Sequence, residues 1–453
     1  MARSANQNDI SYGAIFKLAW PASVASSVTP LLGVVDVWAL GQSSRPLDIA
    51  AVGLGAVIFS LAYWTFGFVR MSVAGLTAQA VGAQDETEAR AALARGGAIC
   101  GGIGLALIIL QAPIGALAFI ALSTESEASA QTLANARAYF DIRIWGAPFA
   151  LGAYAVFGWL TARGRTDYLM IASVFMTGLN IVLDYIFVVM FDWGAPGVAA
   201  GTLIAEIAGF FVALAFVGRV MASHGGLRSH WALNGFWRLE PWRRTLAVNL
   251  DIFIRTLLLA FSFSWFIQRG GAFGDVTLAA NQLLIQLFLI TGLALDGTAI
   301  AAETLVGQAL GAKDKTRGAA RFQQAVRKTF ILAGLGALAF VSVYGLAGDF
   351  LISLLTPEGP IAAASRTFMP WVIISPLIVV IGFQLDGIFV GATLSREMRN
   401  SMIISAPLFI ALSIVLAERY GNHGLWAAFS VYFVARAITL GAYMPRLRRR
   451  FGL

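Results

Sequence analysis

The sequence predicts an all-α integral membrane protein with twelve transmembrane helices in two six-helix bundles. Of its 453 residues, 58% are hydrophobic and only 12% are charged, whereas soluble domains usually carry about 25% charged residues. Apolar runs of roughly 20 residues, enough for a helix to span a bilayer, recur along the whole chain. They are much longer than the roughly ten-residue alternating segments of a membrane β-barrel, so strands are not expected.

Apolar runs bounded by polar or charged residues define the spans, with ends uncertain by several residues. The predicted spans are 13–41, 49–73, 94–122, 138–161, 168–191, 196–220, 245–268, 277–305, 322–354, 367–392, 400–418 and 423–444.

Basic residues predict the orientation, because short cytoplasmic loops carry an excess of Arg and Lys. The loops after odd-numbered spans hold few, whereas those after even-numbered spans and the tail "RLRRRFGL" hold many. Both termini are therefore expected in the cytoplasm. The same bias accounts for the net charge of +8 without a nucleic-acid partner. The basic residues after even-numbered spans are Arg90, Arg95, Arg163, Arg165, Arg228, Arg238, Arg243, Arg244, Lys313, Lys315, Arg317, Arg396 and Arg399.

The chain repeats at about half its length. "QAVGAQDETEA" from Gln79 resembles "QALGAKDKTRG" from Gln308, 229 residues later, and "GAPGVAA" from Gly194 pairs with "GNHGLWA" from Gly421. Six spans per half is an even number, so the halves face the same way and are expected to be related by a pseudo-two-fold axis along the membrane normal. We predict an N-terminal lobe at 1–220, a basic cytoplasmic linker at 221–244 and a C-terminal lobe at 245–453. Such a repeat favours a transporter that rocks one half against the other.

Polar residues inside the spans of the first half share one depth. Asp36 lies on span 1, Asn180 and Asp184 on span 5, and Thr202 on span 6. At 1.5 Å rise per residue, Asp36, Asp184 and Thr202 fall roughly 7–11 Å below the outer boundary, and Tyr139 lies at the outer mouth of span 4. Span 5 also carries Thr177 on the face of Asn180 and Asp184.

Intramembrane acids are costly and usually functional. Two carboxylates, an amide and a hydroxyl are hard oxygen ligands that suit a small cation. The two acids also suit a proton, because like charges in a low dielectric favour one shared proton. The alternative is that Asp36 and Asp184 only form hydrogen bonds within the bundle.

The second half carries a different set of charges, toward the cytoplasmic ends of its spans: Asp251 and Arg255 on span 7, Asp296 and Glu303 on span 8, and Asp386 on span 10. Asp251 and Arg255 have the i, i+4 spacing of an ion pair, although Asp386 or Asp296 would also satisfy the arginine. Four acids against one base suggest that an acid is protonated or faces a cavity. A packing network and a substrate or proton site are both consistent with this pattern.

Pro21 lies fifteen residues before Asp36 inside span 1. An interior proline removes a backbone hydrogen bond and promotes a kink. A bend there would move Asp36 relative to span 5, whereas a static kink accommodated by neighbouring helices is the alternative.

The chain resembles the multidrug and toxic compound extrusion (MATE) transporters, and within them the DinF-like branch, over nearly its whole length. The matching pieces are "WP…VVDVWALG", "GLNIVLDY", "NLDIFIRTLLL", "LALDGTAIAAETLVGQALGAKD" and "LDGIFVGAT". The resemblance implies two six-helix lobes around a central cavity, and export of organic, often cationic, compounds driven by inward protons or sodium ions. It places Asp36, Asn180, Asp184 and Thr202 in a cation site of the first lobe, with Tyr139 nearby.

These expectations describe a secondary active antiporter of the bacterial-type inner (plasma) membrane that works by alternating access. Asp36, Asn180, Asp184 and Thr202 would ligate a metal only if the coupling ion is sodium. No cofactor is expected, and the expected partners are small organic substrates and membrane lipids, with the protein a monomer. The alternative is a lipid or lipid-linked precursor flippase, which would need a cationic cavity for phosphate groups. An enzyme is not expected, since the spans show no metal cluster or nucleophile–base set.

Overall fold

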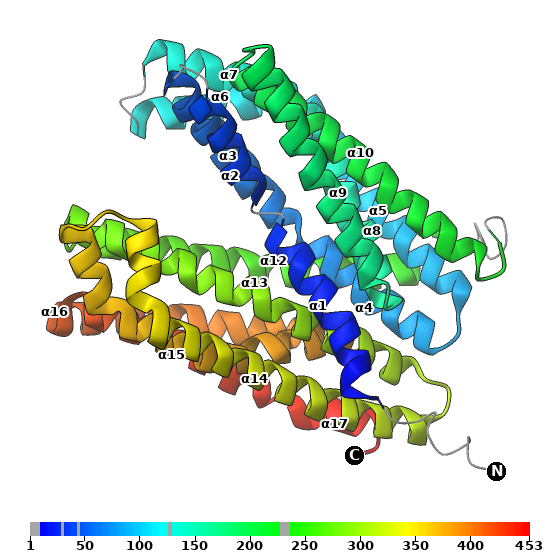
Figure 1. Cartoon of the computed structure of the whole chain (residues 1–453). Helices are drawn as coiled ribbons and strands as arrows, with labels where there is room; N and C mark the ends of the chain where they lie inside the picture. Colours follow the sequence, from blue (N-terminus) through cyan, green and yellow to red (C-terminus); the bar gives the residue numbers. More distant parts are fainter. Residues whose placement is uncertain (1–9, 29–30, 43–45, 126–128, 227–235) are drawn as a thin grey trace. The chain divides into compact units, whose positions relative to one another are not determined.

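The computed structural model describes residues 10–28, 31–42, 46–125, 129–226 and 236–453, and every regular element within them is a helix (Figure 1). In chain order they are α1 (Tyr12–Val28), α2 (Leu31–Gln42), α3 (Pro46–Phe66), α4 (Phe68–Gly82), α5 (Glu86–Ile109), α6 (Gln111–Glu125), α7 (Ala130–Arg143), the short 3₁₀-helix η1 (Ile144–Gly146), α8 (Ala147–Ala162), α9 (Thr166–Asp184), the π-helix η2 (Tyr185–Met190), α10 (Ala195–Ala222), α12 (Leu239–Gly271), α13 (Asp275–Gly311), α14 (Lys315–Leu355), α15 (Pro360–Gly391), α16 (Ser395–Gly441) and α17 (Met444–Arg450).

Each of the twelve predicted spans corresponds to helix in the described residues. Ten helical stretches there are long and apolar enough to cross a membrane. The other two of the twelve spans lie where a helix turns sharply or is divided into two. The helix α16 turns at Gly421, whose φ of 58° and ψ of −140° are not helical, so it contains spans eleven and twelve. Span two is divided between α3 and α4, and its apolar part, Leu47–Ser60, is short.

The chain folds into two compact units. The first-half unit consists of Val24–Thr77 and Asp85–Trp242, and the second-half unit of Met1–Ser23, Ala78–Gln84 and Arg243–Leu453. The boundaries expected at 220 and 245 follow chain order, but the structure also assigns two segments of the first half to the second-half unit. Much of the expected linker, 227–235, lies outside the described residues.

Contacts between α1 and α13 explain why the N-terminal segment belongs to the second-half unit. The Ser23 hydroxyl of α1 donates to the Ala294 carbonyl of α13 at 2.6 Å. A Cβ on Gly297 would lie 2.2 Å from the carbonyl oxygen of Ala19, so only glycine allows this approach.

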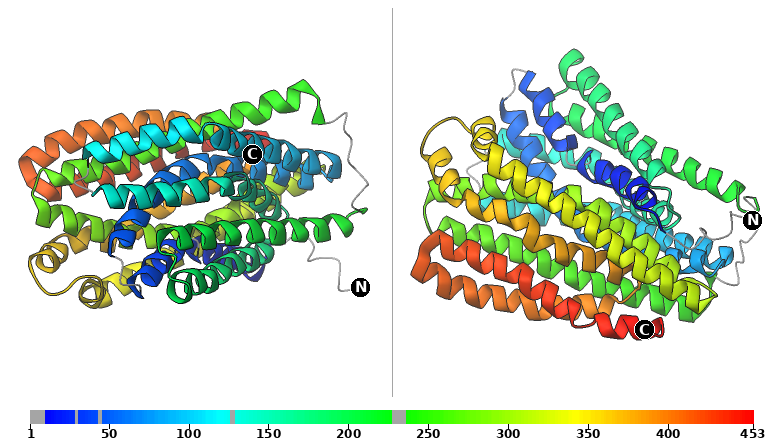
Figure 2. Two further views of the ribbon diagram at one scale, coloured as in Figure 1. Left: turned by 90° about the horizontal axis from the view of Figure 1, so that it is seen from above. Right: turned by 60° about the horizontal axis from the view of Figure 1, so that its bottom comes forward.

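Helix packing inside each unit is extensive. In the second-half unit, α13 packs on α14 and α15, and α15 packs on α16; Figure 2 shows these helices running side by side. Their shared core is aromatic and includes Phe266, Phe288, Trp426, Phe429 and Phe433. In the first-half unit, α10 packs on α7, α8 and α9, while α3 packs on α7. This arrangement gathers the polar residues described below.

The sequence repeat is also a repeat of backbone conformation. Gly194 has φ 62° and ψ −139°, nearly the values at Gly421, and each begins a span. Gly164 and Thr393, 229 residues apart, both have positive φ, at 73° and 52°. Each closes a helix with the same pair of backbone hydrogen bonds, the pattern of a Schellman C-cap. The two halves therefore share their helix ends as well as their helix order.

The repeated "QAVG" and "QALG" motifs cross each other inside the second-half unit. A Cβ on Gly82 would lie 2.1 Å from the Gln308 carbonyl oxygen, and one on Gly311 would lie 2.0 Å from the Gln79 carbonyl oxygen. The contact is reciprocal, because each glycine meets the backbone of the other motif's glutamine. We call these four residues the reciprocal crossing.

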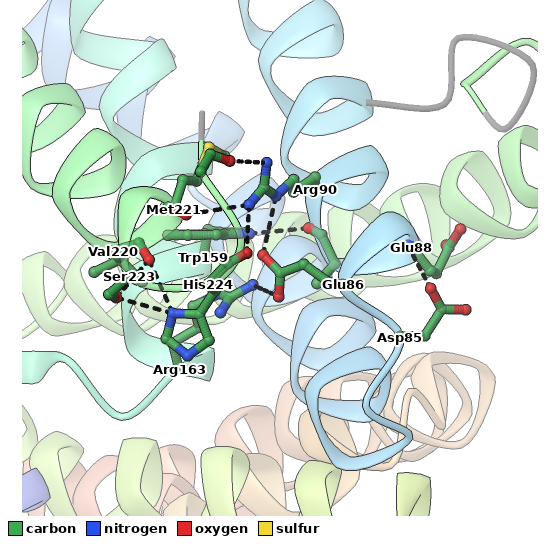
Figure 3. A network of polar contacts seen from close by, with 12 residues as sticks. Asp85, Glu86, Glu88, Arg90, Trp159, Arg163, Val220, Met221, Ser223 and His224 are labelled. Carbon is green, nitrogen blue, oxygen red and sulfur yellow. Dashed lines mark hydrogen bonds and ion pairs between the residues drawn. The ribbon is translucent and has the colours of Figure 1, made fainter. Parts of the chain in front are cut away.

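A network of polar contacts surrounds the start of α5 in the first-half unit (Figure 3). Glu86 accepts from Arg90 at 3.0 Å and from Arg163 at 2.5 Å. The fully buried Arg90 also donates to the carbonyl oxygens of Met221 and His224, at 3.3 and 3.0 Å. These carbonyls lie at the C-terminal end of α10, where the last carbonyls lack an i+4 helical N–H and take other donors. The Met221 carbonyl also accepts from the backbone N–H of His224 at 3.1 Å. Arg90 thus fastens α5 to the end of α10.

Candidate cation site and charged networks

Three helices of the first-half unit bring Asp36, Asn180, Asp184 and Thr202 together. Asp36 comes from α2, Asn180 and Asp184 from α9, and Thr202 from α10, and all four are buried. The Asn180 amide donates to the Thr202 hydroxyl at 3.3 Å, and this hydroxyl donates to the Val198 carbonyl at 2.9 Å. The carboxyl groups of Asp36 and Asp184 interact with each other and with the Asn180 side chain. The depth argument therefore selected residues that are neighbours in space.

The backbone around Asp184 makes this meeting possible. Gly201 of α10 lies so close that a Cβ there would be 2.5 Å from the Asp184 Oδ1 atom. Directly after Asp184, the chain changes from α-helix to the π-helix Tyr185–Met190. Short π-helical turns are rare and often occur at functional sites.

Several oxygens of this cluster lack a hydrogen-bond partner among the described residues. They are Oδ1 of Asp36, both carboxyl oxygens of Asp184, Oδ1 of Asn180 and the hydroxyl of Thr177. Buried polar atoms are nearly always paired, so unpaired ones mark a site that takes up a ligand or a proton. Thr177 is buried on the same helix, two turns before Asp184, and bonds to none of the other four.

Tyr139, predicted at the outer mouth of span 4, has a fully buried side chain. Its depth in the membrane stays a prediction. Its hydroxyl accepts a hydrogen bond from the Arg143 Nη1 atom at 2.5 Å. The other Nη of Arg143 donates to Glu206 Oε1 at 3.1 Å, and the guanidinium lies 5.0 Å from the centre of the Phe59 ring. Burial follows because α7 packs against both α3 and α10.

Arg143 and Glu206 are the residues that the sequence interpretation missed. A signal for them exists, since Arg143 follows Tyr139 by four residues and Glu206 follows Thr202 by four, the spacing of one helix face. Arg143 also interacts electrostatically with Asp36 and Asp184. The cluster therefore joins three carboxylates and one guanidinium.

Asp251 and Asp386 of the second-half unit form ion pairs, and of the partners considered for Arg255 the structure shows Asp386 and not Asp251. Arg255 donates to Asp386 Oδ2 at 2.5 Å, and the same oxygen is bound by Arg436. Asp251 instead accepts from Arg399 at 2.5 Å and from the Ser395 hydroxyl at 2.9 Å. The i, i+4 spacing allowed the predicted pair, but the start of α16 offers Asp251 a closer partner.

The excess of acids in this half is smaller than the count of four to one. The count of four acids to one base omitted Arg399 and the fully buried Arg436. Asp296 interacts electrostatically with Arg255. The charges near Arg255 are therefore largely balanced, which fits the packing alternative for Asp386 and Asp251.

Pro21 lies within α1, which is assigned as one helix from Tyr12 to Val28. It is flanked by Ala19 and Ser23, the two residues that contact α13. Its role as a moving kink stays a prediction.

Comparison with known proteins places these features in a family. The MatE family model matches residues 21–186 and 252–438. The DNA damage-inducible protein F of Escherichia coli (strain K12) is 35% identical over 437 residues, which is 96% of this chain and 92% of that protein. The multidrug export protein MepA of Staphylococcus aureus (strain NCTC 8325 / PS 47) is 20% identical, over 92% of this chain and 90% of MepA.

Solved structures show the same fold. A crystal structure of MATE in complex with MaD3S has a TM-score of 0.84 at 20% identity and covers 98% of this chain and 97% of its own. An outward-facing multidrug resistance MATE transporter of the MOP superfamily has a TM-score of 0.82 at 19% identity, over 97% and 96%. The twelve-helix fold and the resemblance to the MATE family and DinF are confirmed. The chain therefore belongs to the MATE family of multidrug and toxic compound efflux transporters, and it is not an enzyme.

Proposed function

We propose that this chain is a secondary active antiporter that exports organic, often cationic, compounds in exchange for cations moving inward, by alternating access. The observation that carries the proposal is the pair of interacting buried carboxyl groups of Asp36 and Asp184. Asp36 Oδ1 and both Asp184 oxygens lack a hydrogen-bond partner among the described residues. Export of many drugs by MepA, as its name states, supports the substrate class.

A proton is the coupling ion that we propose. Two neighbouring acids in a low dielectric favour one shared proton. Sodium is the alternative, because the unpaired oxygens of Asp36, Asn180 and Asp184 would suit a small cation. The Thr202 hydroxyl oxygen already accepts from Asn180 and donates to Val198, which reduces its capacity as a ligand.

Coupling follows from linkage. If the loaded and empty states of Asp36 and Asp184 favour different conformations, then the cation and the substrate change each other's affinity by the same factor. Loading from outside would favour release of substrate outside, and release of the proton inside would favour reloading with substrate. In this proposal the protein is a monomer in the plasma membrane with both termini in the cytoplasm.

The flippase alternative receives less support. Its cationic cavity would have to come from arginines such as Arg255 and Arg436, but both bind Asp386.

Dye efflux from proteoliposomes tests the proposal, with proton and sodium gradients imposed separately. We expect efflux driven by the proton gradient and lost in Asp36→Asn and Asp184→Asn. The matched control is Asp349→Asn, since the Asp349 side chain is 86% exposed on α14. Efflux that survives collapse of both gradients, or Asp36 and Asp184 variants that behave like the control, would exclude the antiport mechanism.

A further inference from the structure

We propose that Arg143 is an internal counter-cation that competes with the coupling cation for Asp36 and Asp184, and that Glu206 and Tyr139 hold it away while the cation is bound. Arg143 and Glu206 are thus positioning residues that tune the affinity of the site. The inference rests on the proposed antiport function and adds a mechanism for release.

The placement of the ion pair supports this role. Arg143 lies one turn beyond Tyr139 on α7, and Glu206 lies one turn beyond Thr202 on α10. The side chains of Arg143 and Glu206 are only 13% and 8% exposed. A guanidinium so deeply buried must keep an anionic partner, because an uncompensated buried charge costs several kcal/mol.

The polar atoms of this cluster have a second possible pairing. Among the described residues, Arg143 Nε has no acceptor, while Asp36 Oδ1 and both Asp184 oxygens have no donor. If the guanidinium turned toward Asp36, the unpaired Nε–H group of Arg143 could donate to the unpaired Oδ1 atom of Asp36. When the acids carry no proton, their charge draws Arg143 toward them. When a proton neutralises them, Glu206 and Tyr139 are the stronger partners.

Arg143 is the partner that can move. A Cβ on Gly146 would lie 2.7 Å from Glu206 Oε2, so the backbone of η1 closes against this carboxylate. Arg143 has the longer side chain, and its charge interacts favourably with the rings of Phe59, Tyr63 and Tyr139, at 5.0, 6.0 and 5.7 Å. These rings form an aromatic surface along which the guanidinium can shift while its charge stays stabilised.

Charged and titratable groups face this cluster from six helices. Any pH dependence reflects all of them: Asp36 of α2, Tyr63 of α3, Tyr139 and Arg143 of α7, Tyr154 of α8, Asp184 of α9 and Glu206 of α10.

The two members of the ion pair make opposite predictions, which separates competition from a structural role. Without the positive charge in Arg143→Gln, Asp36 and Asp184 should hold a proton more tightly. In Glu206→Gln, Arg143 loses its partner and should turn to the two acids, so they should release the proton more easily. The double variant should behave like Arg143→Gln. A purely structural role would shift both single variants in the same direction. Two fixed charges would shift them in opposite directions but would cancel in the double variant, which competition does not allow.

The test is labelling of the purified full-length protein with dicyclohexylcarbodiimide, which reacts with protonated carboxyl groups, followed over pH and assigned to Asp36 and Asp184 by peptide mass spectrometry. We expect the midpoint to rise by about one pH unit in Arg143→Gln and to fall in Glu206→Gln, the scale on which a neighbouring charge acts on a carboxyl group. The control is Arg137→Gln, an arginine of α7 that is 39% exposed and paired with Asp141.

Shifts of the same sign, or no shift relative to the control, would overturn the inference. If Arg143→Gln fails to fold, Arg143→Lys keeps the charge but loses the planar fork, and its midpoint should rise by less. Labelling requires neither a gradient nor transport. The midpoints could therefore shift as expected while efflux responds to neither gradient. That result would exclude the antiport function but would leave the competition by Arg143 supported.

Discussion

Gly201 determines how closely α10 approaches the Asp184 carboxylate. A methyl group there would lie 2.5 Å from Oδ1, so Gly201→Ala must displace the carboxylate from its present position. We expect proton-driven efflux to fall about tenfold, the effect of roughly 1–3 kcal/mol of overpacking, with the protein still folded. The control is Gly178→Ala on α9, where a Cβ meets nothing within 4 Å. Equal efflux in the two variants would contradict the proposed importance of the Asp36–Asp184 contact.

Asp386 holds two buried guanidinium groups, from Arg255 and Arg436. Removing it in Asp386→Ala leaves both without this carboxylate, and we expect a loss of about 3–5 kcal/mol in the free energy of unfolding. Thermal unfolding in detergent measures this loss. The control is Glu358→Gln, which breaks an exposed pair with Arg366 and should leave the melting temperature nearly unchanged. A similar small effect of both substitutions would show that the buried cluster is not held by Asp386.

At this scale, sequence reasoning found the acids but not their counter-charge. Depth along a helix follows from counting residues, so the sequence alone is enough to group Asp36, Asp184 and Thr202. Arg143 and Glu206 escaped because pairing depends on how each helix is rotated, which an almost uniformly apolar span does not record. Asp251 shows the same limit, since its partner Arg399 comes from a helix more than a hundred residues away.

Close packing at the reciprocal crossing depends on glycine at the ends of α4 and α13. The atoms facing Gly311 are backbone, the Gln79 carbonyl oxygen at 2.0 Å, so no side chain can move aside for a methyl group. We expect Gly311→Ala to lower thermal stability by about 1–3 kcal/mol. Gly334→Ala on α14 is the control, because open space surrounds that position. Equal melting temperatures of Gly311→Ala and Gly334→Ala would show that the two helices can separate at little cost in free energy.

Helices themselves were well predicted, because a run of about 20 apolar residues leaves few alternatives in a bilayer. The breaks inside the runs were harder. Hydropathy measures the length of a segment and not the direction of its backbone. It separated the last two spans at 419–422, where α16 turns at Gly421, but it did not predict the division between α3 and α4. The repeat gave partial guidance by aligning Gly194 with Gly421, two positions that share one backbone conformation.

The second half of the chain does not contain a complete compact unit. Ala78–Gln84 and Met1–Ser23 belong to the unit built mainly from Arg243–Leu453. If the chain is divided between Gly226 and Phe236, we expect the second half alone to be unstable and co-expression of both halves to restore dye efflux. Size-exclusion chromatography of each fragment and of the pair provides the measurement. A second half that is monodisperse and thermally stable by itself would contradict this expectation.

The sequence predicted two lobes by counting spans, and chain order was the natural place to divide them. The sequence does not show in which unit each helix end packs. Small residues such as Gly82 and Gly311 allow two helices to touch, but their partners are set by packing over the whole molecule. The units therefore had to come from the structure.

The reciprocal crossing also bears on ancestry. Contacts that exchange roles, with Gly82 on Gln308 and Gly311 on Gln79, are those of an isologous interface between two identical subunits. Duplication and fusion of a gene for a six-helix homodimer would preserve such an interface within one chain. Once fused, each copy was free to diverge elsewhere: the positions of Asn180 and Asp184 correspond to Pro407 and Ala411 in the second half. The glycine contact needs both copies, whereas the proposed cation site is built from one.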